Sequence, residues 1–199
     1  MEPALPGVEL RAGDALLVVD LQRDFLPGGS LAVPGGDAVV EPVTAWLARF
    51  HALGLPVFAS RDWHPPDHAS FQAQGGPWPP HCVAGTPGAE FADALRLPPG
   101  IGIVSKGVAQ GSAGYSAFEG TDLHRRLQAR GVRRLFVAGL ATDYCVLKTA
   151  LDALALGYAV VLLTDAVAAV NVQPGDGTRA LAQLQAAGAT LAESPVPVV

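Results

Sequence analysis

In this 199-residue chain, an aspartate, a lysine and a cysteine each follow an apolar run. Lysine and cysteine are both scarce here. The chain contains only two lysines and two cysteines. Asp20 closes the first apolar run, Lys106 follows a later one, and Cys145 comes soon after the run that ends at Gly139. If they meet in space, the thiol could attack an acyl carbon, with the carboxylate as base and the ammonium stabilising negative charge.

Cys145 is the strongest candidate nucleophile. It lies where an apolar strand is expected to pass through a glycine-containing turn into a helix. A thiol in the first turn of a helix lies near exposed N–H groups and the positive end of the macrodipole, which favour the thiolate. Two N–H groups of this turn could also stabilise an oxyanion. A small buried apolar residue is the alternative interpretation of any cysteine, and we prefer it for Cys82, which lies in a proline-rich loop.

Asp20 and Lys106 each have a second interpretation. A carboxylate at the end of a buried strand is poorly solvated, so its pKa can rise and it can accept a proton; an aspartate that only bonds the next loop fits equally well. Lys106 could be an exposed loop lysine, but beside Asp20 and Cys145 its ammonium would stabilise both a carboxylate and a thiolate. Lys148, one helical turn beyond Cys145, is interpreted as a bystander.

A cluster of metal-ligand residue types occupies a short part of the chain. It comprises Asp62, His64, His68 and His81. The spacing of His64 and His68 would suit a helix, but the two prolines at 65–66 exclude one, so the ligands must converge from a loop. A mixed nitrogen and oxygen set suits zinc, iron or manganese. Histidines that only make loop hydrogen bonds are the alternative, especially for His68.

The elements needed to position these residues alternate along the chain. Strands are expected at 14–20, 56–60, 101–105, 133–139, 158–164 and 189–191, and helices at 39–53, 121–131, 143–157 and 176–188. Six strands alternating with helices predict a single α/β domain over residues 1–199, with a mostly parallel sheet between two helical layers and a Rossmann-like topology. Ligands of such sheets bind beyond the carboxyl ends of the strands. Residues 61–100 break the rhythm and are expected to form a functional loop region.

Composition excludes several other classes of protein. A net charge of −5 argues against a nucleic-acid-binding surface. No apolar run approaches the roughly 20 residues of a membrane span, and the first residues lack the basic region of a secretory signal. We therefore expect a cytoplasmic protein with reduced thiols, either a monomer or a homo-oligomer. Residues 1–11 are expected to be a loose extension.

Several stretches, in this order, resemble a known family. They are VDLQRDF from Val19, GGSL from Gly28, DWH from Asp62, DH from Asp67, WPPHCVAGTPG from Trp78, SKG from Ser105, YSAF from Tyr115 and GLATDYCV from Gly139. Together they resemble the nicotinamidase/pyrazinamidase group of the isochorismatase-like cysteine hydrolases, over nearly the whole chain. The stretches around His81 and Cys145 are the most specific.

The resemblance implies an amidohydrolase that converts nicotinamide to nicotinate and ammonia through a thioester, in NAD salvage, and that also acts on pyrazinamide. It implies that Asp20, Lys106 and Cys145 form the catalytic triad. It also implies a cis peptide bond between Leu140 and Ala141, with the N–H groups of Ala141 and Cys145 as the oxyanion hole.

The resemblance also assigns a metal site and a substrate pocket. The implied metal ligands are Asp62, His64 and His81, and His68 matches a position that ligates the metal in only some members. A single divalent ion is expected, with zinc preferred over iron or manganese. The implied aromatic walls of the pyridine pocket are Phe25, Trp78 and Tyr115.

Three other functions are consistent with parts of this pattern. An amidohydrolase for carbamoyl or ureido substrates shares the triad, but such relatives generally lack the aspartate and histidine set. Hydrolysis of the isochorismate vinyl ether does not need the thiol of Cys145. A non-catalytic binding module on the same fold would not need the triad.

Overall fold

The computed structural model describes residues 8–193, which are built around one six-stranded sheet. All neighbouring strands are parallel, in the order β3-β2-β1-β4-β5-β6. The strands are β1 (Asp14–Val19), β2 (Val57–Asp62), β3 (Gly102–Lys106), β4 (Arg134–Leu140), β5 (Ala159–Ala168) and β6 (Thr190–Ala192). The order reverses direction between β1 and β4, so a ligand is expected beyond the carboxyl ends of these two strands.

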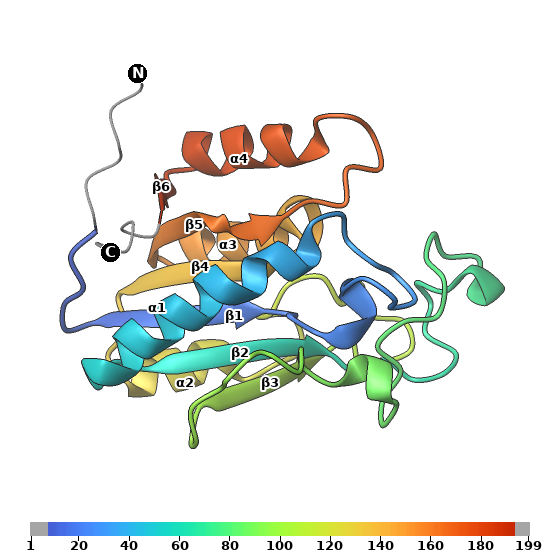
Figure 1. Cartoon of the computed structure of the whole chain (residues 1–199), viewed down its shortest axis with the longest axis horizontal. Helices are drawn as coiled ribbons and strands as arrows, with labels where there is room; N and C mark the ends of the chain where they lie inside the picture. The colour runs from blue at the N-terminus through green and yellow to red at the C-terminus, as the bar shows by residue number, and fades with distance from the viewer. Residues whose placement is uncertain (1–7, 194–199) are drawn as a thin grey trace.

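Helices cover both faces of this sheet (Figure 1). They are α1 (Val40–Ala52), α2 (Leu123–Ala129), α3 (Leu147–Ala155) and α4 (Asp176–Ala186). Short 3₁₀ turns occur at Arg23–Phe25, Gly36–Val39, Gln72–Gln74 and Pro87–Ala89. Side chains of α1 pack on one face, and those of α2, α3 and α4 pack on the other. The three-layer α/β prediction is therefore confirmed, and the sheet is entirely parallel.

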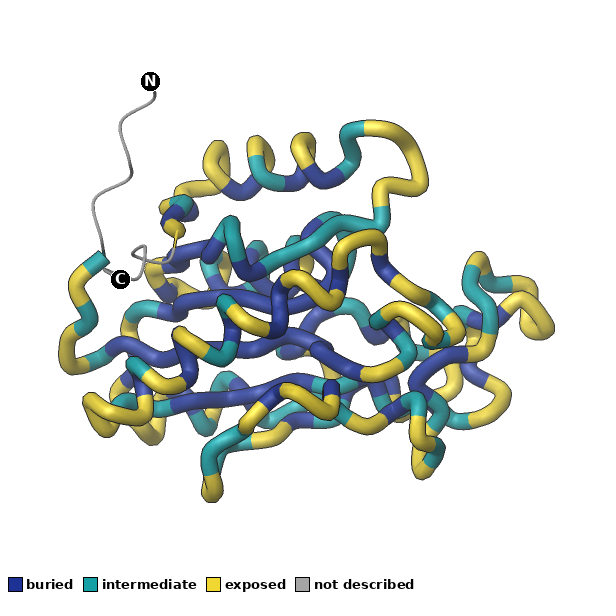
Figure 2. The backbone as a smooth tube through the Cα atoms, viewed as in Figure 1, coloured by how far each residue is buried: buried dark blue, intermediate teal, exposed yellow. Residues whose placement is uncertain are grey.

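Side chains of β1 alternate between the two faces of the sheet, and each face has its own hydrophobic core. Every residue of β1 is buried, as expected for a strand covered on both faces. Leu16 and Val18 contact the cluster under α1, whereas Leu17 and Val19 contact the cluster on the other face, because successive side chains of a strand point in opposite directions. Figure 2 shows the strands as the buried centre of the molecule.

Helix α1 follows the spacing of its apolar residues. Val43, Trp46, Leu47 and Phe50 recur at three- and four-residue intervals and are buried, which is the pattern of a helix with one core-facing stripe. The chain leaves the helix through Gly54, whose φ of +64° is one that glycine adopts at little cost.

The expected elements are all present, with different ends. Strand β5 continues to Ala168 because its pairing with β4 resumes after an irregularity, with Gly139 opposite Val167. Of the expected N-terminal extension, residues 1–7 lie outside the described residues; Val8 packs on the core under α1. Within the described part of the chain, no helix has both the length and the apolar character needed to cross a membrane.

Candidate active site

The ends of four strands bring the predicted site residues together. Asp20 directly follows β1, Asp62 is the last residue of β2, and Lys106 is the last residue of β3. Cys145 lies just beyond β4, in a single wide, π-helical turn over Thr142–Val146 that leads into α3. Acceptor atoms of Asp20, Asp62 and Cys145 all lie within 4.8 Å of one another, and all three residues are buried.

Lys106 connects these groups and is itself fully buried. Its Nζ lies 2.7 Å from Asp20 Oδ2 and 2.5 Å from Asp62 Oδ1. It also donates to the carbonyl oxygen of Gly114 at 2.6 Å and lies 3.4 Å from Cys145 Sγ. The two carboxylates outweigh the effect of burial and hold the pKa of Lys106 well above its ordinary value. Lys106 is therefore a permanent buried cation, not an exposed loop lysine.

Asp20 has the properties of a proton acceptor near neutral pH. Burial raises its pKa to about 6, although Lys106 opposes the shift. Ser60 donates a hydrogen bond of 2.7 Å to Asp20 Oδ1. The backbone of Asp20 has a φ of +48°, in the left-handed region that aspartate tolerates better than most residues, and this turns the chain away from the sheet.

Cys145 is held as a thiol rather than a thiolate. Burial raises its pKa well above the ordinary value, and the ammonium of Lys106 only partly compensates. The expectation that the helix terminus favours a thiolate was therefore wrong, because it neglected desolvation in a closed site. The thiol needs a base, and Asp20 is within reach.

The turn before Cys145 requires a close approach of two strands. The peptide bond between Leu140 and Ala141 is cis, as the resemblance implied. Gly139 has a φ of +112°, and a Cβ there would lie 2.0 Å from the carbonyl oxygen of Val19. Only glycine fits that position. Ala141 and Cys145 both line the pocket described below.

Asp62, His64 and His81 form a compact set of ligand atoms beside the triad. One ligand atom of each lies within 4.8 Å of the others, and all three residues are buried. His64 Nδ1 lies 2.9 Å from the carbonyl oxygen of Gly107, and His81 Nδ1 lies 2.8 Å from that of Pro79. A carbonyl can only accept, so each Nδ1 carries the proton and each Nε2 keeps its lone pair for a ligand. One carboxylate and two oriented imidazoles fit a divalent ion such as zinc.

The structure does not place His68 in that set. Its ring stacks on His64 at 4.0 Å between centroids, and its Nδ1 lies 2.7 Å from Ser70 Oγ. Burial lowers the pKa of His68 to about 4, so the ring is neutral at pH 7.

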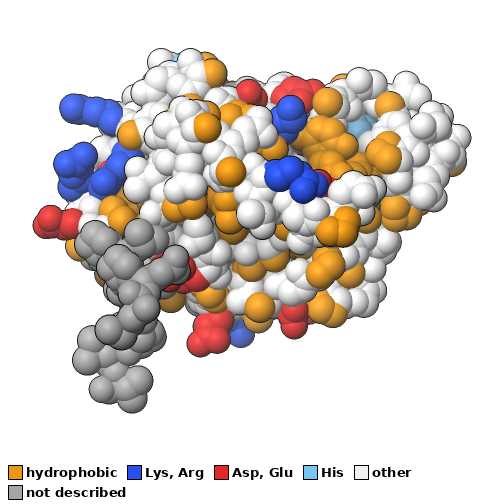
Figure 3. Space-filling view, turned by 90° about the horizontal axis from the view of Figure 1, so that it is seen from above, with side chains coloured by type: hydrophobic (Ala, Val, Ile, Leu, Met, Phe, Trp, Pro, Cys, Tyr) orange, Lys and Arg blue, Asp and Glu red, His pale blue; other side chains and the backbone are white. Residues whose placement is uncertain are grey.

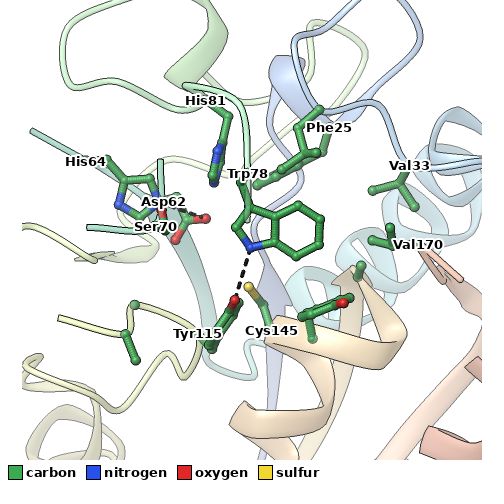
Figure 4. Close-up of a pocket in the computed structure, with 15 residues that line it drawn as sticks. Phe25, Val33, Asp62, His64, Ser70, Trp78, His81, Tyr115, Cys145 and Val170 are labelled. Atoms are coloured by element: carbon green, nitrogen blue, oxygen red, sulfur yellow. Dashed lines mark hydrogen bonds and ion pairs between the residues drawn. The ribbon is translucent and has the colours of Figure 1, made fainter. Parts of the chain in front are cut away.

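A pocket lined by Cys145 and the three ligands has two unlike walls (Figure 4). The polar wall consists of Asp62, His64, Ser70 and His81. The apolar wall consists of Phe25, Leu31, Val33 and Val170. Cys145 lies between the two walls in Figure 4. In Figure 3, part of a histidine is visible among hydrophobic side chains towards the end of the molecule that carries the long loops. Such a pocket suits a small flat ring with one polar edge.

Aromatic side chains close this pocket, and one of them was not predicted. Trp78 Nε1 donates a hydrogen bond of 3.0 Å to the hydroxyl of Tyr115. Tyr144 contacts both rings, edge-on to Trp78 at 5.0 Å and tilted to Tyr115 at 5.7 Å between centroids. Its position next to Cys145 was a signal that could have identified it.

Four other reactive residues contribute no side chain to the lining of this pocket. Cys82 is buried in the core under α1, and burial raises the pKa of its thiol. Lys148 is exposed on α3. The imidazole of His124 lies 2.9 Å from the hydroxyl of Tyr158, and His51 is exposed. Cys82 and Lys148 therefore fit their interpretations as a small buried residue and a bystander.

Comparison with known proteins agrees with this geometry. The model of the Isochorismatase domain matches residues 14–195. The chain belongs to the isochorismatase family. Within that family, it is 41% identical to the nicotinamidase of Escherichia coli, over 89% of this chain and 93% of the relative. It is 42% identical to the nicotinamidase/pyrazinamidase of Mycobacterium tuberculosis, over 79% of this chain and 87% of the relative.

A solved structure of the family extends the comparison to three dimensions. The pyrazinamidase of Pyrococcus horikoshii in complex with zinc superposes with a TM-score of 0.87 and 47% sequence identity. The match covers 91% of this chain and 99% of the other. The likeness in fold therefore extends over most of this chain and nearly all of the other.

Proposed function

We propose that this protein is a nicotinamidase, which hydrolyses nicotinamide to nicotinate and ammonia and also accepts pyrazinamide. The observation that carries the proposal is the buried contact of Lys106 with Asp20, Asp62 and Cys145 beside the ligand set. The nicotinamidase and pyrazinamidase names of its relatives support the substrate. We also propose that the product enters NAD salvage, as the family resemblance implies, and that the protein acts in the cytoplasm.

In the first half of the reaction, Asp20 takes the proton of the Cys145 thiol. The sulfur attacks the carboxamide carbon, a C–S bond forms, and the π electrons of the carbonyl move to its oxygen. The N–H groups of Ala141 and Cys145 would stabilise that oxyanion, and the ammonium of Lys106 balances the negative charge as the proton moves. When the carbonyl re-forms, the C–N bond breaks and the leaving nitrogen takes the proton from Asp20 as ammonia.

In the second half, Asp20 is again a carboxylate and takes a proton from water. The resulting hydroxide attacks the thioester carbon, and the C–S bond breaks. The proton on Asp20 returns to the sulfur, so the thiol and the carboxylate are both restored. A base with a pKa near the working pH suits such a two-way transfer, and the pKa of about 6 for Asp20 meets that requirement.

Asp62, His64 and His81 would hold the divalent ion, and we propose zinc. When bound, the ion supplies a Lewis-acid site for the ring nitrogen of the substrate. Phe25, Trp78 and the other aromatic groups would then hold the ring so that its carboxamide faces Cys145.

Ammonia release tests the proposal. Metal-stripped protein reconstituted with zinc should release ammonia from nicotinamide, and much less from a ureido substrate of similar size. A zinc-loaded protein that binds nicotinamide but releases no ammonia would instead be the binding module. Preference for the ureido substrate would identify the other kind of amidohydrolase.

A further inference from the structure

A buried glutamine joins the ends of β1 and β2. Gln22 is fully buried, and its side-chain amide makes three hydrogen bonds to backbone groups. The N–H of Asp62 donates to Gln22 Oε1 at 2.8 Å, and Gln22 Nε2 donates to the carbonyl oxygens of Asp62 and Ala89, both at 2.8 Å. The amide therefore satisfies both backbone groups of Asp62 at once.

The side chain of Gln22 makes the hydrogen bonds to Asp62 of β2 that the backbone of β1, which ends at Val19, does not make. Pairing between β1 and β2 stops at Ser60, opposite Val19, and the chain then turns away at Asp20. On the other side, Asp62 still pairs with Lys106 of β3. Without Gln22, the N–H and carbonyl groups of Asp62 that face β1 would be buried with no partner, which is costly. A primary amide offers a donor and an acceptor side by side, as a peptide group does, so it extends the ladder by one step.

The carboxylate of Asp62 contacts both the triad and the ligand set. Asp62 Oδ1 lies 2.5 Å from Lys106 Nζ, whereas Oδ2 lies 3.4 Å from His64 Nε2, within the ligand set. A rotation of the Asp62 backbone would therefore disturb the metal ligands and the triad together. Groups that orient a metal ligand typically affect metal affinity by 10- to 100-fold.

We propose that Gln22 is a positioning residue, which fixes the carboxylate of Asp62 between Lys106 and the two histidine ligands. The inference rests on the metal site of the proposed function. It differs from a general stabilising role, because a merely structural glutamine would change the unfolding temperature but leave the affinity of the folded protein for metal unchanged.

Zinc affinity, measured by competition with a chromogenic chelator, tests the inference without turnover. Gln22→Met keeps the length of the side chain and removes all three hydrogen bonds, and it should weaken zinc binding about 10-fold or more. Gln22→Asn keeps the amide but is too short to reach all three partners, so it should weaken binding to a smaller extent. It also serves as the test if Gln22→Met does not fold. The matched control is Phe50→Leu, because Phe50 is buried in α1 in the core and away from the pocket. It should lower the unfolding temperature and leave zinc affinity unchanged.

Kinetics give a second readout. At saturating zinc, kcat for nicotinamide should remain several-fold lower in Gln22→Met than in the original protein, because Asp62 also positions Lys106. Zinc affinity within twofold of the original in folded Gln22 variants would overturn the inference, as would an original protein that binds no zinc. An original protein that binds zinc but does not hydrolyse nicotinamide would refute the proposed function and leave the zinc test of Gln22 intact.

Discussion

Removal of the Ser60 hydroxyl should shift the acidic limb of the pH–rate profile to higher pH. If Asp20 must be ionised to accept the Cys145 proton, kcat/KM for nicotinamide should fall below about pH 6, the pKa of that carboxyl. Ser60 donates a 2.7 Å hydrogen bond to the ionised form of Asp20, inside the protein. Ser60→Ala removes that bond and should raise the pKa of Asp20.

The size of the shift follows from the strength of the lost bond. A hydrogen bond to a charged group is worth about 1.5–3 kcal/mol, and one pKa unit corresponds to about 1.4 kcal/mol. The acidic limb of Ser60→Ala should therefore move up by about 1 unit or more, to pH 7 or above. Activity at pH 5.5 should fall much more than activity at pH 8.5.

Two further variants make the assignment specific. Asp20→Asn removes the base, and burial raises the pKa of the Cys145 thiol above its ordinary value. Because loss of a general base typically lowers the rate about 10²- to 10⁴-fold, activity should fall at least ~100-fold. Ser30→Ala removes an exposed hydroxyl and should leave the limb where it was. If the limb of Ser60→Ala stayed at the original pH, the titrating group would not be Asp20 and the mechanism would need another base.

Three other predictions concern the buried charges and the ligand set. Lys106→Met leaves Asp20 and Asp62 without their cation and should lower the free energy of unfolding by about 3–5 kcal/mol in urea titrations. The control Lys148→Met replaces an exposed lysine and should change the free energy of unfolding by less than about 0.5 kcal/mol. Equal effects of the two substitutions would contradict the buried charge network. Zinc at about 100 times its Kd should add about 2.7 kcal/mol to the stability of the metal-stripped protein. Calorimetry should find this gain lost in His81→Ala but kept in His68→Ala; a loss in both variants would contradict the ligand set of Asp62, His64 and His81. Gly107→Ala would place a Cβ 2.4 Å from His64 Cε1 and should weaken zinc binding at least 10-fold. The control Gly111→Ala adds a Cβ in open space and should bind zinc normally. Normal zinc binding by both variants would contradict the close packing of Gly107 against His64.

The sequence was sufficient to predict where reactive groups meet, because that depended on strand ends. Asp20, Asp62 and Lys106 each follow a short apolar run, and parallel strands bring such ends to one edge of the sheet. The ends of longer elements were less predictable. Strand β5 extends to Ala168 because of its pairing with β4 across the irregularity near Gly139, and no local pattern encodes that pairing.

Properties that depend on three-dimensional surroundings were missed or predicted with the wrong sign. The pKa of Cys145 was expected to fall, but it rises because desolvation in the closed site exceeds the attraction of Lys106. Val33 and Val170 meet in the pocket from distant parts of the chain and carry no motif. Gln22 lay inside a recognised stretch, yet only the geometry connects its amide to the backbone of Asp62.

The most direct test of the account is a comparison of the two cysteines in one assay. Both are free and buried among the described residues, but only Cys145 touches Lys106. Zinc-loaded Cys145→Ala should fold, bind zinc and release ammonia from nicotinamide at no more than background rate, while Cys82→Ala should retain most of the original rate. Appreciable ammonia release by folded Cys145→Ala would contradict the central claim that its sulfur attacks the carboxamide.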